Sequence, residues 1–347
     1  MSVHPSGPPS PLTVSDLGER ALIERIRARV GSPAAWTVVG LGDDAAVVAP
    51  VRGELDVLTT DTLVEDVHFR RAWTLPDLIG RKAVAINLSD LAAMGATPRA
   101  VLLGLCLPDA LPIEDFDAVI DGVIAEATAA RAALVGGNIS RSPGPLIVDV
   151  TATGSVHRRR MLTRVGGKAG DELYVTGEVG GAATGLALLQ DGIARDGLEQ
   201  ALTDCLARFE RPEARLRCGR LVAGHRAASA CMDLSDGLAD AAHQVAQASG
   251  TGVVIEAEAI PVHEGARLWG HRRDLDPLLL ALTGGEDYEL LFAVPQKRRR
   301  AFLAAMQRCR PATAVKVGTL TKEPQALLMR DGKTGPLPAG FAHFGNK

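Results

Sequence analysis

The spacing of apolar residues in the first half of the chain predicts alternating helices and strands. A helix is expected to begin near Ser15 and Asp16 and to end at Gly31, before Pro33. Trp36 to Ala49 has the pattern of two short strands joined by a turn at Gly40 and Gly42. Further helices are predicted over 75–94 and 112–133, and further strands over 56–61, 100–107 and 145–153.

The second half repeats this alternation. The same patterns predict strands over 171–176, 253–256 and 290–294, and helices over 182–190, 238–249 and 297–308. Mixed strands and helices in both halves indicate two α/β or α+β domains. The polar segment 157–168 is the expected boundary, so we predict a disordered tail over 1–14, an N-terminal domain over 15–156 and a C-terminal domain over 157–347.

Composition narrows the class of protein. Hydrophobic residues make up 46% of the 347 residues, but aromatic residues only 3%, which favours an enzyme core of Ala, Val, Leu and Ile over an aromatic-rich binding module. The formal net charge of -3 and the lack of a long basic block argue against nucleic acid as a partner. The short basic runs 157–160 and 297–300 are interpreted as solvated surface.

The cysteines and the N-terminal residues indicate a cytoplasmic protein. The chain has five cysteines without a C-x-x-C pair, which predicts reduced, buried thiols. Residues 1–12 are rich in Pro, Ser and Gly and lack the apolar core of a signal peptide. No apolar run approaches the roughly 20 residues that a membrane-spanning helix needs, so no membrane partner is expected.

Carboxylates gather in five short segments at predicted strand or helix ends. The segments are G-D-D-A at 42–45, T-T-D-T at 59–62, N-L-S-D at 87–90, D-L-S-D-G at 233–237 and G-G-E-D-Y at 284–288. Each alone has a structural explanation, because Asp beside Gly forms turns and Asp236 can cap the next helix. Asp90 and Asp233, however, lie in or after apolar stretches, where a carboxylate is expensive unless it is paired or binds a metal. Ligands with oxygen alone favour Mg²⁺.

The common phosphate-binding loops are absent. Gly332-Lys333-Thr334 lacks the first glycine of a P-loop, because Leu327 takes that position. The 180–185 segment opens a helix and is able to cradle an anion, but its spacing is not G-x-G-x-x-G, and helix–sheet packing is the preferred interpretation. Several Mg²⁺ ions held by scattered carboxylates would neutralise nucleotide phosphates instead, as phosphoryl transfer requires.

Together, five motifs closely resemble the thiamine-monophosphate kinase family, which belongs to the superfamily of aminoimidazole-ribotide-synthetase-like ATP enzymes. The motifs are G-D-D-A-A-V-V, T-T-D-T-L-V-E-D-V-H-F, N-L-S-D-L-A-A-M-G-A-T-P, M-D-L-S-D-G-L and G-G-E-D-Y-E-L, and the likeness runs from about Leu17 to Phe344. The resemblance implies a two-domain fold with mixed sheets flanked by helices, a homodimer built through the N-terminal domains, and direct in-line transfer of the ATP γ-phosphoryl group to thiamine monophosphate.

The resemblance also implies roles for individual residues. The expected Mg²⁺ ligands are Asp44, Thr59, Thr60, Asp61, Asp90, Asn138, Asp233 and Asp236. ATP is expected to contact Gly137, Asn138, Arg164 and Ser235, and the thiamine substrate to contact His68, Glu286 and Phe341. Asn138 departs from the family pattern, since many relatives have Asp there. An amide oxygen still binds Mg²⁺ but brings no charge, so we expect weaker metal binding at that position, or one fewer ordered Mg²⁺, rather than loss of function.

The charge of the acceptor phosphate determines whether the enzyme needs a general base. A phosphate monoester has a second pKa of about 6 and is largely a dianion at neutral pH, so no general base is expected. His68 is then predicted to orient the substrate phosphate, with a satisfied buried imidazole as the alternative. Other readings are a sister ATP enzyme with a different acceptor, a metal-dependent phosphatase, or a metal-binding scaffold.

Overall fold

The computed structural model describes residues 11–340 of the chain. The described residues form two compact units. The first unit consists of Met1–Pro50, Thr60–Val84 and Ala100–Thr151, and the second of Val51–Thr59, Ala85–Arg99 and Ala152–Lys347. The division differs from the predicted segments 15–156 and 157–347, and those boundaries stay a prediction. Helix α3 contributes its C-terminal half to the second unit, which matters for the site described below.

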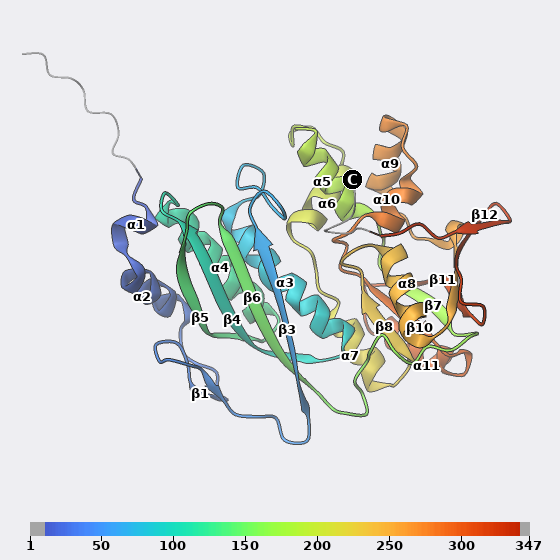
Figure 1. Cartoon of the computed structure of the whole chain (residues 1–347), viewed down its shortest axis with the longest axis horizontal. Helices are drawn as coiled ribbons and strands as arrows, with labels where there is room; N and C mark the ends of the chain where they lie inside the picture. Colours follow the sequence, from blue (N-terminus) through green and yellow to red (C-terminus); the bar gives the residue numbers. More distant parts are fainter. Residues whose placement is uncertain (1–10, 341–347) are drawn as a thin grey trace, which may run out of the picture. The chain divides into compact units, whose positions relative to one another are not determined.

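The first unit is built around a four-stranded sheet with the strand order β3-β6-β4-β5. Its strands are β3 (Leu55–Val64), β4 (Thr97–Pro108), β5 (Ala133–Ser142) and β6 (Ile147–Val156). Helix α4 (Ile113–Ala129) connects the parallel strands β4 and β5, as parallel pairing requires. Helices α3 (Pro76–Ala93) and α4 lie on the same face of the sheet (Figure 1).

Helices α3 and α4 approach each other closely through two glycines. A Cβ atom at Gly80 would lie 2.0 Å from the Val119 carbonyl oxygen, and one at Gly122 would lie 2.0 Å from the Asp77 carbonyl oxygen. The two backbones therefore touch, and this contact fixes the position of the helix that carries the N-L-S-D motif.

The N-terminal segment differs from prediction at its helices. The expected single helix is divided into α1 (Val14–Leu17) and α2 (Glu19–Val30), because Gly18 between them has φ 76°. Thr13 and Asp16 form a capping box around α1. The predicted hairpin is confirmed as β1 (Thr37–Val39) paired with β2 (Val47–Val48). The predicted helix over 112–133 ends at Ala129, since Arg131 has φ 60°, and Ala133 begins β5.

The second unit contains a seven-stranded sheet with the order β13-β12-β9-β11-β7-β10-β8. All its neighbouring strands pair antiparallel except β9 and β12. The strands are β7 (Glu172–Thr176), β8 (Ala230–Asp233), β9 (Gly252–Glu256), β10 (Leu290–Val294), β11 (Ala314–Thr321), β12 (Ala326–Arg330) and β13 (Lys333–Pro336). The helices are α5 (Gly181–Gln190), α6 (Gln200–Glu210), α7 (Leu216–Gly224), α8 (Leu238–Ser249), α9 (Glu264–Arg273), α10 (Pro277–Thr283) and α11 (Arg299–Gln307), with short 3₁₀ turns at Ala257–Ala259 and Gln296–Arg298.

Apolar side chains cover both faces of this sheet. Leu291 and Ala293 of β10 belong to the core beneath α8, whereas Phe292 packs with Phe302 of α11 on the opposite face. Side chains alternate between the faces of a strand, so a strand buried on both faces is a continuous apolar run. This explains why β10 and α8 are found where the sequence predicts them.

Several other expectations have a definite outcome. The mixed α/β class is confirmed. Gly332 lies in the turn between β12 and β13, Lys333 and Thr334 begin β13, and no helix follows before the described residues end at 340. All five cysteines are free, but Cys106 is half-buried rather than buried. Among the helices of residues 11–340, none is long and apolar enough to span a membrane.

Candidate functional site

Helix α3 brings two residues of the N-L-S-D motif beside other predicted site residues. The Ser89 hydroxyl donates a hydrogen bond of 2.7 Å to Oδ2 of Asp233, at the end of β8, and both side chains are buried. The neighbouring Asp90 accepts a hydrogen bond from the Thr59 hydroxyl on β3. The structure thus gathers Thr59, Asp90 and Asp233 around the C-terminal half of one helix.

Burial sets the electrostatics of this cluster. Burial raises the pKa of Asp90, and the hydrogen bond from Thr59 and the positive charge of Arg164 oppose that rise. Arg164 is therefore close enough to Asp90 to act on it electrostatically. Its Nη1 atom donates to Oε1 of Gln244 at 2.6 Å, which holds the guanidinium beside α8. A cation that approaches Asp90 therefore lowers the free energy of its charged carboxylate.

The G-G-E-D-Y-E-L segment is joined by backbone hydrogen bonds to the D-L-S-D-G turn. Glu286 N donates to the Ser235 carbonyl at 2.7 Å, and Tyr288 N donates to the Leu234 carbonyl at 3.1 Å. These bonds continue the antiparallel pairing of β10 with β8, in which Leu290 faces Asp233. The second unit therefore brings Asp233, Ser235 and Glu286 together, and Asp236 follows in the same turn.

The loop that carries Glu286 has a strained backbone. Glu286 and Tyr288 have φ angles of 68° and 48°, which side-chain-bearing residues rarely adopt. The residues between and after them anchor the loop, because Asp287 and Glu289 are both buried. Strain of this kind persists only where surrounding contacts impose it.

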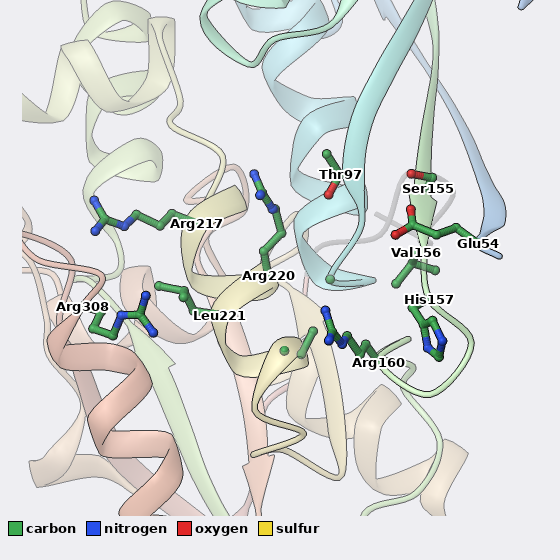
Figure 2. A pocket seen from close by; sticks show the side chains of 13 residues that line it. Glu54, Thr97, Ser155, Val156, His157, Arg160, Arg217, Arg220, Leu221 and Arg308 are labelled. Carbon is green, nitrogen blue, oxygen red and sulfur yellow. The ribbon is translucent and has the colours of Figure 1, made fainter. Parts of the chain in front are cut away.

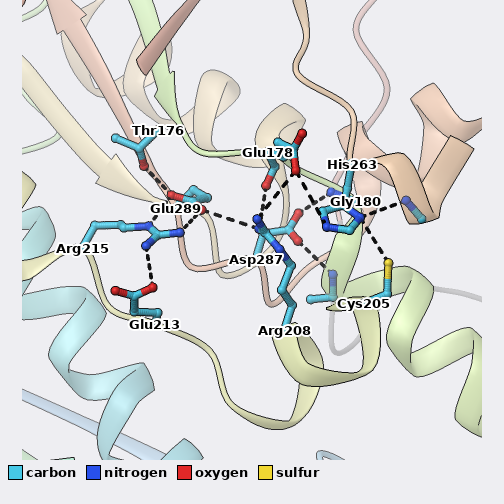
Figure 3. A network of polar contacts seen from close by, with 12 residues as sticks. Thr176, Glu178, Gly180, Cys205, Arg208, Glu213, Arg215, His263, Asp287 and Glu289 are labelled. Carbon is cyan, nitrogen blue, oxygen red and sulfur yellow. Dashed lines mark hydrogen bonds and ion pairs between the residues drawn. The ribbon is translucent and has the colours of Figure 1, made fainter. Parts of the chain in front are cut away.

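Two buried carboxylates supply those contacts (Figure 3). Asp287 accepts hydrogen bonds from the backbone N–H groups of Gly180 (2.6 Å) and Ala182 (3.0 Å) at the start of α5. Glu289 accepts from Arg215, with its Oε1 2.5 Å from Nη2, and from the Thr176 hydroxyl at 2.6 Å. Burial raises the pKa of Asp287 to about 6. The helix start at 180–185 therefore binds the protein's own carboxylate.

Strand β3, which the two units share, carries three of the predicted residues. Thr59, Asp61 and Leu63 alternate with Thr60 and Thr62, so they lie on opposite faces of the strand. The Thr60 hydroxyl is 3.1 Å from the Thr151 hydroxyl on β6. The side chain of Thr60 is therefore not brought together with those of Thr59 and Asp61.

The remaining predicted residues of the first unit lie in three places. Asp44 is exposed in the β1–β2 hairpin, where its N–H donates to the carboxylate of Asp43 at 2.8 Å. His68 is half-buried in the turn after β3, and its Nδ1 accepts a hydrogen bond of 3.1 Å from Val64 N. Asn138 is exposed on β5 opposite Gly104.

Gly137 meets its neighbouring strand more closely than any other residue type would allow. A Cβ atom there would lie 1.9 Å from the Leu103 carbonyl oxygen of β4. In the second unit, Phe341 lies outside the described residues. The preceding Gly340 packs on α8, since its Cβ would be 2.4 Å from the Cβ of Asp240.

The side chains around Asp90 suit a hard cation in their chemistry. Thr59, Ser89, Asp90 and Asp233 present oxygen atoms alone, which is the donor type that Mg²⁺ prefers. Within residues 11–340, no three side chains of His, Cys, Asp or Glu are grouped closely enough to hold a metal ion by themselves. A metal ion at this place would therefore be held by hydroxyl oxygens together with the carboxylates.

Three residues with clear positions in this site are missing from the sequence-based candidates. Ser89 positions Asp233, and Asp287 and Glu289 anchor the strained loop. All three lie inside motifs that the sequence analysis identifies, and Ser89 and Asp287 are each next to a residue that it selects. The motif itself was the available signal, while the direction of each side chain depends on partners distant in sequence.

Comparison with known proteins places both units in one family. Residues 42–156 match the family model of the AIR synthase related protein, N-terminal domain, and residues 168–329 match that of the C-terminal domain. The thiamine-monophosphate kinase of Synechococcus elongatus is 36% identical over 96% of this chain and 98% of its own length. That of Escherichia coli is 36% identical over 94% of this chain and 98% of its own length.

Solved structures agree with these matches. The thiamine-monophosphate kinase of Stenotrophomonas maltophilia K279a superposes with a TM-score of 0.80 at 36% identity and covers 92% of this chain and 98% of its own. AaThiL complexed with AMPPCP and TMP has a TM-score of 0.75 at 32% identity and covers 96% of this chain and 99% of its own. The hydrogenase maturation protein HypE of E. coli, at 21% identity and a TM-score of 0.75, shares the fold.

His263, beside the anchoring network, gives a test of this part of the structure. His263 is the N-cap of α9, and its Nδ1 accepts a hydrogen bond of 3.0 Å from Gly265 N. The same Nδ1 atom lies 3.3 Å from the Cys205 sulfur. Burial lowers the pKa of His263 below its ordinary value of 6.5. As the pH falls through 6.5, the unfolded chain therefore binds a proton before the folded chain does, and stability is lost.

When the pH is lowered from about 8 to about 5.5, we expect the free energy of unfolding to decrease less in His263→Asn than in the parent. Asparagine keeps an N-cap acceptor but does not titrate. Urea unfolding of both proteins at the two pH values measures the difference. An equal loss of stability in parent and variant would show that His263 is not buried in its neutral form.

Proposed function

Because the chain belongs to the thiamine-monophosphate kinase family of AIR-synthase-related proteins, we propose that it transfers the γ-phosphoryl group of ATP to thiamine monophosphate, giving ADP and thiamine diphosphate. The observation that carries the proposal is the cluster of Thr59, Asp90 and Asp233 at the C-terminal half of α3, with Arg164 beside it. This cluster combines the buried carboxylate of Asp233 and the half-buried carboxylate of Asp90 for a metal with a guanidinium for phosphate, which phosphoryl transfer requires.

Magnesium is the proposed metal, held on side chains from several motifs. The proposed ligands are Asp44, Thr59, Thr60, Asp61, Asp90, Asn138, Asp233 and Asp236. When bound, Mg²⁺ supplies the positive charge that lets two phosphate groups approach each other in line. Ser89 holds the carboxylate of Asp233 in place for this purpose. The side chain of Thr60 faces Thr151, so its part in binding falls to its main-chain carbonyl.

The nucleotide and the thiamine substrate use the remaining candidates. We assign the ATP phosphates to Arg164, Ser235 and the backbone around Gly137 and Asn138, two residues that are exposed. Guanidinium groups bind phosphate oxygens in pairs. Glu286 and Phe341 are assigned to the thiamine, and the strained loop fixes the position of Glu286.

The hydrogen bond at His68 supports a role without proton abstraction. Its Nδ1 lone pair accepts from Val64 N, so in the neutral ring the proton is on Nε2. A protonated Nε2 donates to an anion and cannot accept a proton from it. We therefore propose that His68 binds the substrate phosphate, which is already a dianion at neutral pH.

The proposal includes a homodimer formed through the first unit. Helices α3 and α4 cover one face of the four-stranded sheet, and Thr62, Leu102 and Asp149 lie on its other face. Leu102 is 37% exposed there. A second copy pairing with this face would bury it. The proposed domain limits (15–156 and 157–347) and the cytoplasmic location belong to the same proposal.

A coupled assay of ADP release over a panel of phosphorylated acceptors tests the function. We expect ADP formation to depend on thiamine monophosphate and on Mg²⁺, with thiamine diphosphate appearing in equal amount. Free phosphate without thiamine diphosphate would establish a phosphatase instead. ADP release with another acceptor alone would assign the chain to a sister reaction.

Neutralising the buried carboxylates is expected to stop turnover while the fold survives. Asp90→Asn and Asp233→Asn should each lower kcat about a hundredfold or more, because charge that holds Mg²⁺ is lost. Asp274→Asn is the matched control, since Asp274 is exposed at the C-cap of α9 with φ 53°, where Asn fits. Steady-state kinetics and circular dichroism measure both properties. Near-normal kcat in both buried variants would reject the site.

Removing His68 is expected to weaken substrate binding rather than to abolish a titration. A hydrogen bond to a charged group contributes about 1.5–3 kcal/mol, so His68→Ala should raise KM for thiamine monophosphate roughly ten- to hundredfold. The pH–rate profile of kcat should keep its form. If the alanine variant loses a pH dependence between about 6 and 7, His68 acts as a base and our assignment is wrong.

A further inference from the structure

The second unit contains a basic cavity that the proposed reaction does not use. The cavity measures about 360 Å³ and is formed by α7, the ends of α3 and β6, and the C-terminal end of α11 (Figure 2). Its walls include Arg160, Arg217, Arg220 and Arg308, which come from three separate segments. None of the residues assigned above to ATP, metal or thiamine lines it.

The guanidinium groups of these four arginines are not neutralised by a carboxylate within the described chain, although Arg217 and Arg308 act electrostatically on Cys309. No ion pair or side-chain hydrogen bond joins any of them to another residue of 11–340. Arginines elsewhere in the same unit are neutralised, as Arg195 is by Glu210 and Arg215 by Glu289. Glu54 is the one carboxylate among the residues that line the cavity, so the lining carries three net positive charges with His157 neutral.

The arginines are not needed to complete the ends of the nearby helices. Backbone N–H groups already donate to the last carbonyls of α3, as Gly95 N does to Ala92 O at 3.0 Å and Ala96 N to Leu91 O at 2.9 Å. The end of α7 is closed in the same way, by Ala227 N on Val222 O at 3.0 Å. Capping therefore does not explain why the guanidinium groups gather here.

From this arrangement we infer that the cavity binds a small anion built of two or more linked phosphate groups. Guanidinium groups bind phosphate oxygens through paired N–H donors, and two phosphate groups bring about three to four negative charges, close to the charge of the lining. The hydroxyls of Thr97 and Ser155 add donors. The lining contains no Phe, Tyr or Trp, so there is no ring on which a nucleotide base would stack.

The distribution of charge favours linked phosphates over a single one. In Figure 2, Arg160 and Arg220 lie on the side of Thr97 and Ser155, whereas Arg217 and Arg308 lie on the other side of Leu221. A short chain of phosphates has a separate phosphate group for each pair of arginines.

The cavity is also joined to the helix that carries Asp90. A Cβ at Gly219 of α7 would lie 1.9 Å from the Ala92 carbonyl oxygen, so the backbones of α7 and α3 are in contact. A ligand held by Arg220 therefore restrains α7 against the last turn of α3. Binding is expected to raise the melting temperature of the protein.

Inorganic tripolyphosphate is the probe, titrated calorimetrically into the full-length protein in EDTA, so that Mg²⁺-dependent binding at the kinase site is suppressed. We expect one equivalent to bind per chain, and orthophosphate to bind at least tenfold more weakly. Arg220→Glu and Arg160→Glu should each weaken tripolyphosphate binding at least tenfold. Arg20→Glu is the matched control, because Arg20 is exposed on α2 and its substitution changes the net charge by the same amount.

The double variant Asp90→Asn/Asp233→Asn separates this inference from the proposed function. It should lose kinase activity and keep tripolyphosphate binding. Thermal unfolding of each arginine variant verifies that it is folded. The inference is overturned if the parent binds no tripolyphosphate, if orthophosphate binds equally well, or if Arg20→Glu weakens binding as much as Arg220→Glu does.

Discussion

The arrangement of the site depends on burying the carboxylate of Asp233 without leaving it unpaired. An ionised carboxylate removed from water is costly, and the hydrogen bond from the Ser89 hydroxyl on α3 offsets part of this cost. The pairing of β8 with β10, which continues into the loop before β10, holds the backbone of Asp233 in place. The contact between Ser89 and Asp233 couples the helix to the sheet of the second unit. The same helix carries Asp90, so the position of one carboxylate determines that of the other.

Local sequence was sufficient to predict a strand that is buried on both faces and a helix with one apolar face. Strand β10 is apolar on both faces and α8 has a clear helical period between two glycines, and both lie where the pattern predicts them. Strand β5 is different, because Gly136 and Gly137 weaken its pattern, and only pairing with β4 makes it a strand. Helices α6, α7, α9 and α10 also escape prediction, although the buried residues of α6 and α7 stand at helical spacing.

The motifs identified the chemistry of the candidate site better than its geometry. Residue types pointed to Asp90 and Asp233, and the structure puts both in one cluster. Motifs alone did not separate Thr59 from Thr60, although strand alternation sends their side chains to opposite faces. Nor did they identify Ser89 or Glu289 as supports, because the partners of those residues lie 144 and 74 positions away in sequence.

The left-handed backbone at Glu286 and Tyr288 restricts which sequences this loop tolerates. Valine, isoleucine and threonine are excluded at both positions, because a branched Cβ collides with the main chain at positive φ. Glycine or asparagine would relax the backbone and stabilise the folded protein, but would remove the carboxylate from position 286. Under the proposed assignment of Glu286 to the thiamine, stability and activity favour different residues at the same place, and a search for thermostable variants would remove the proposed contact.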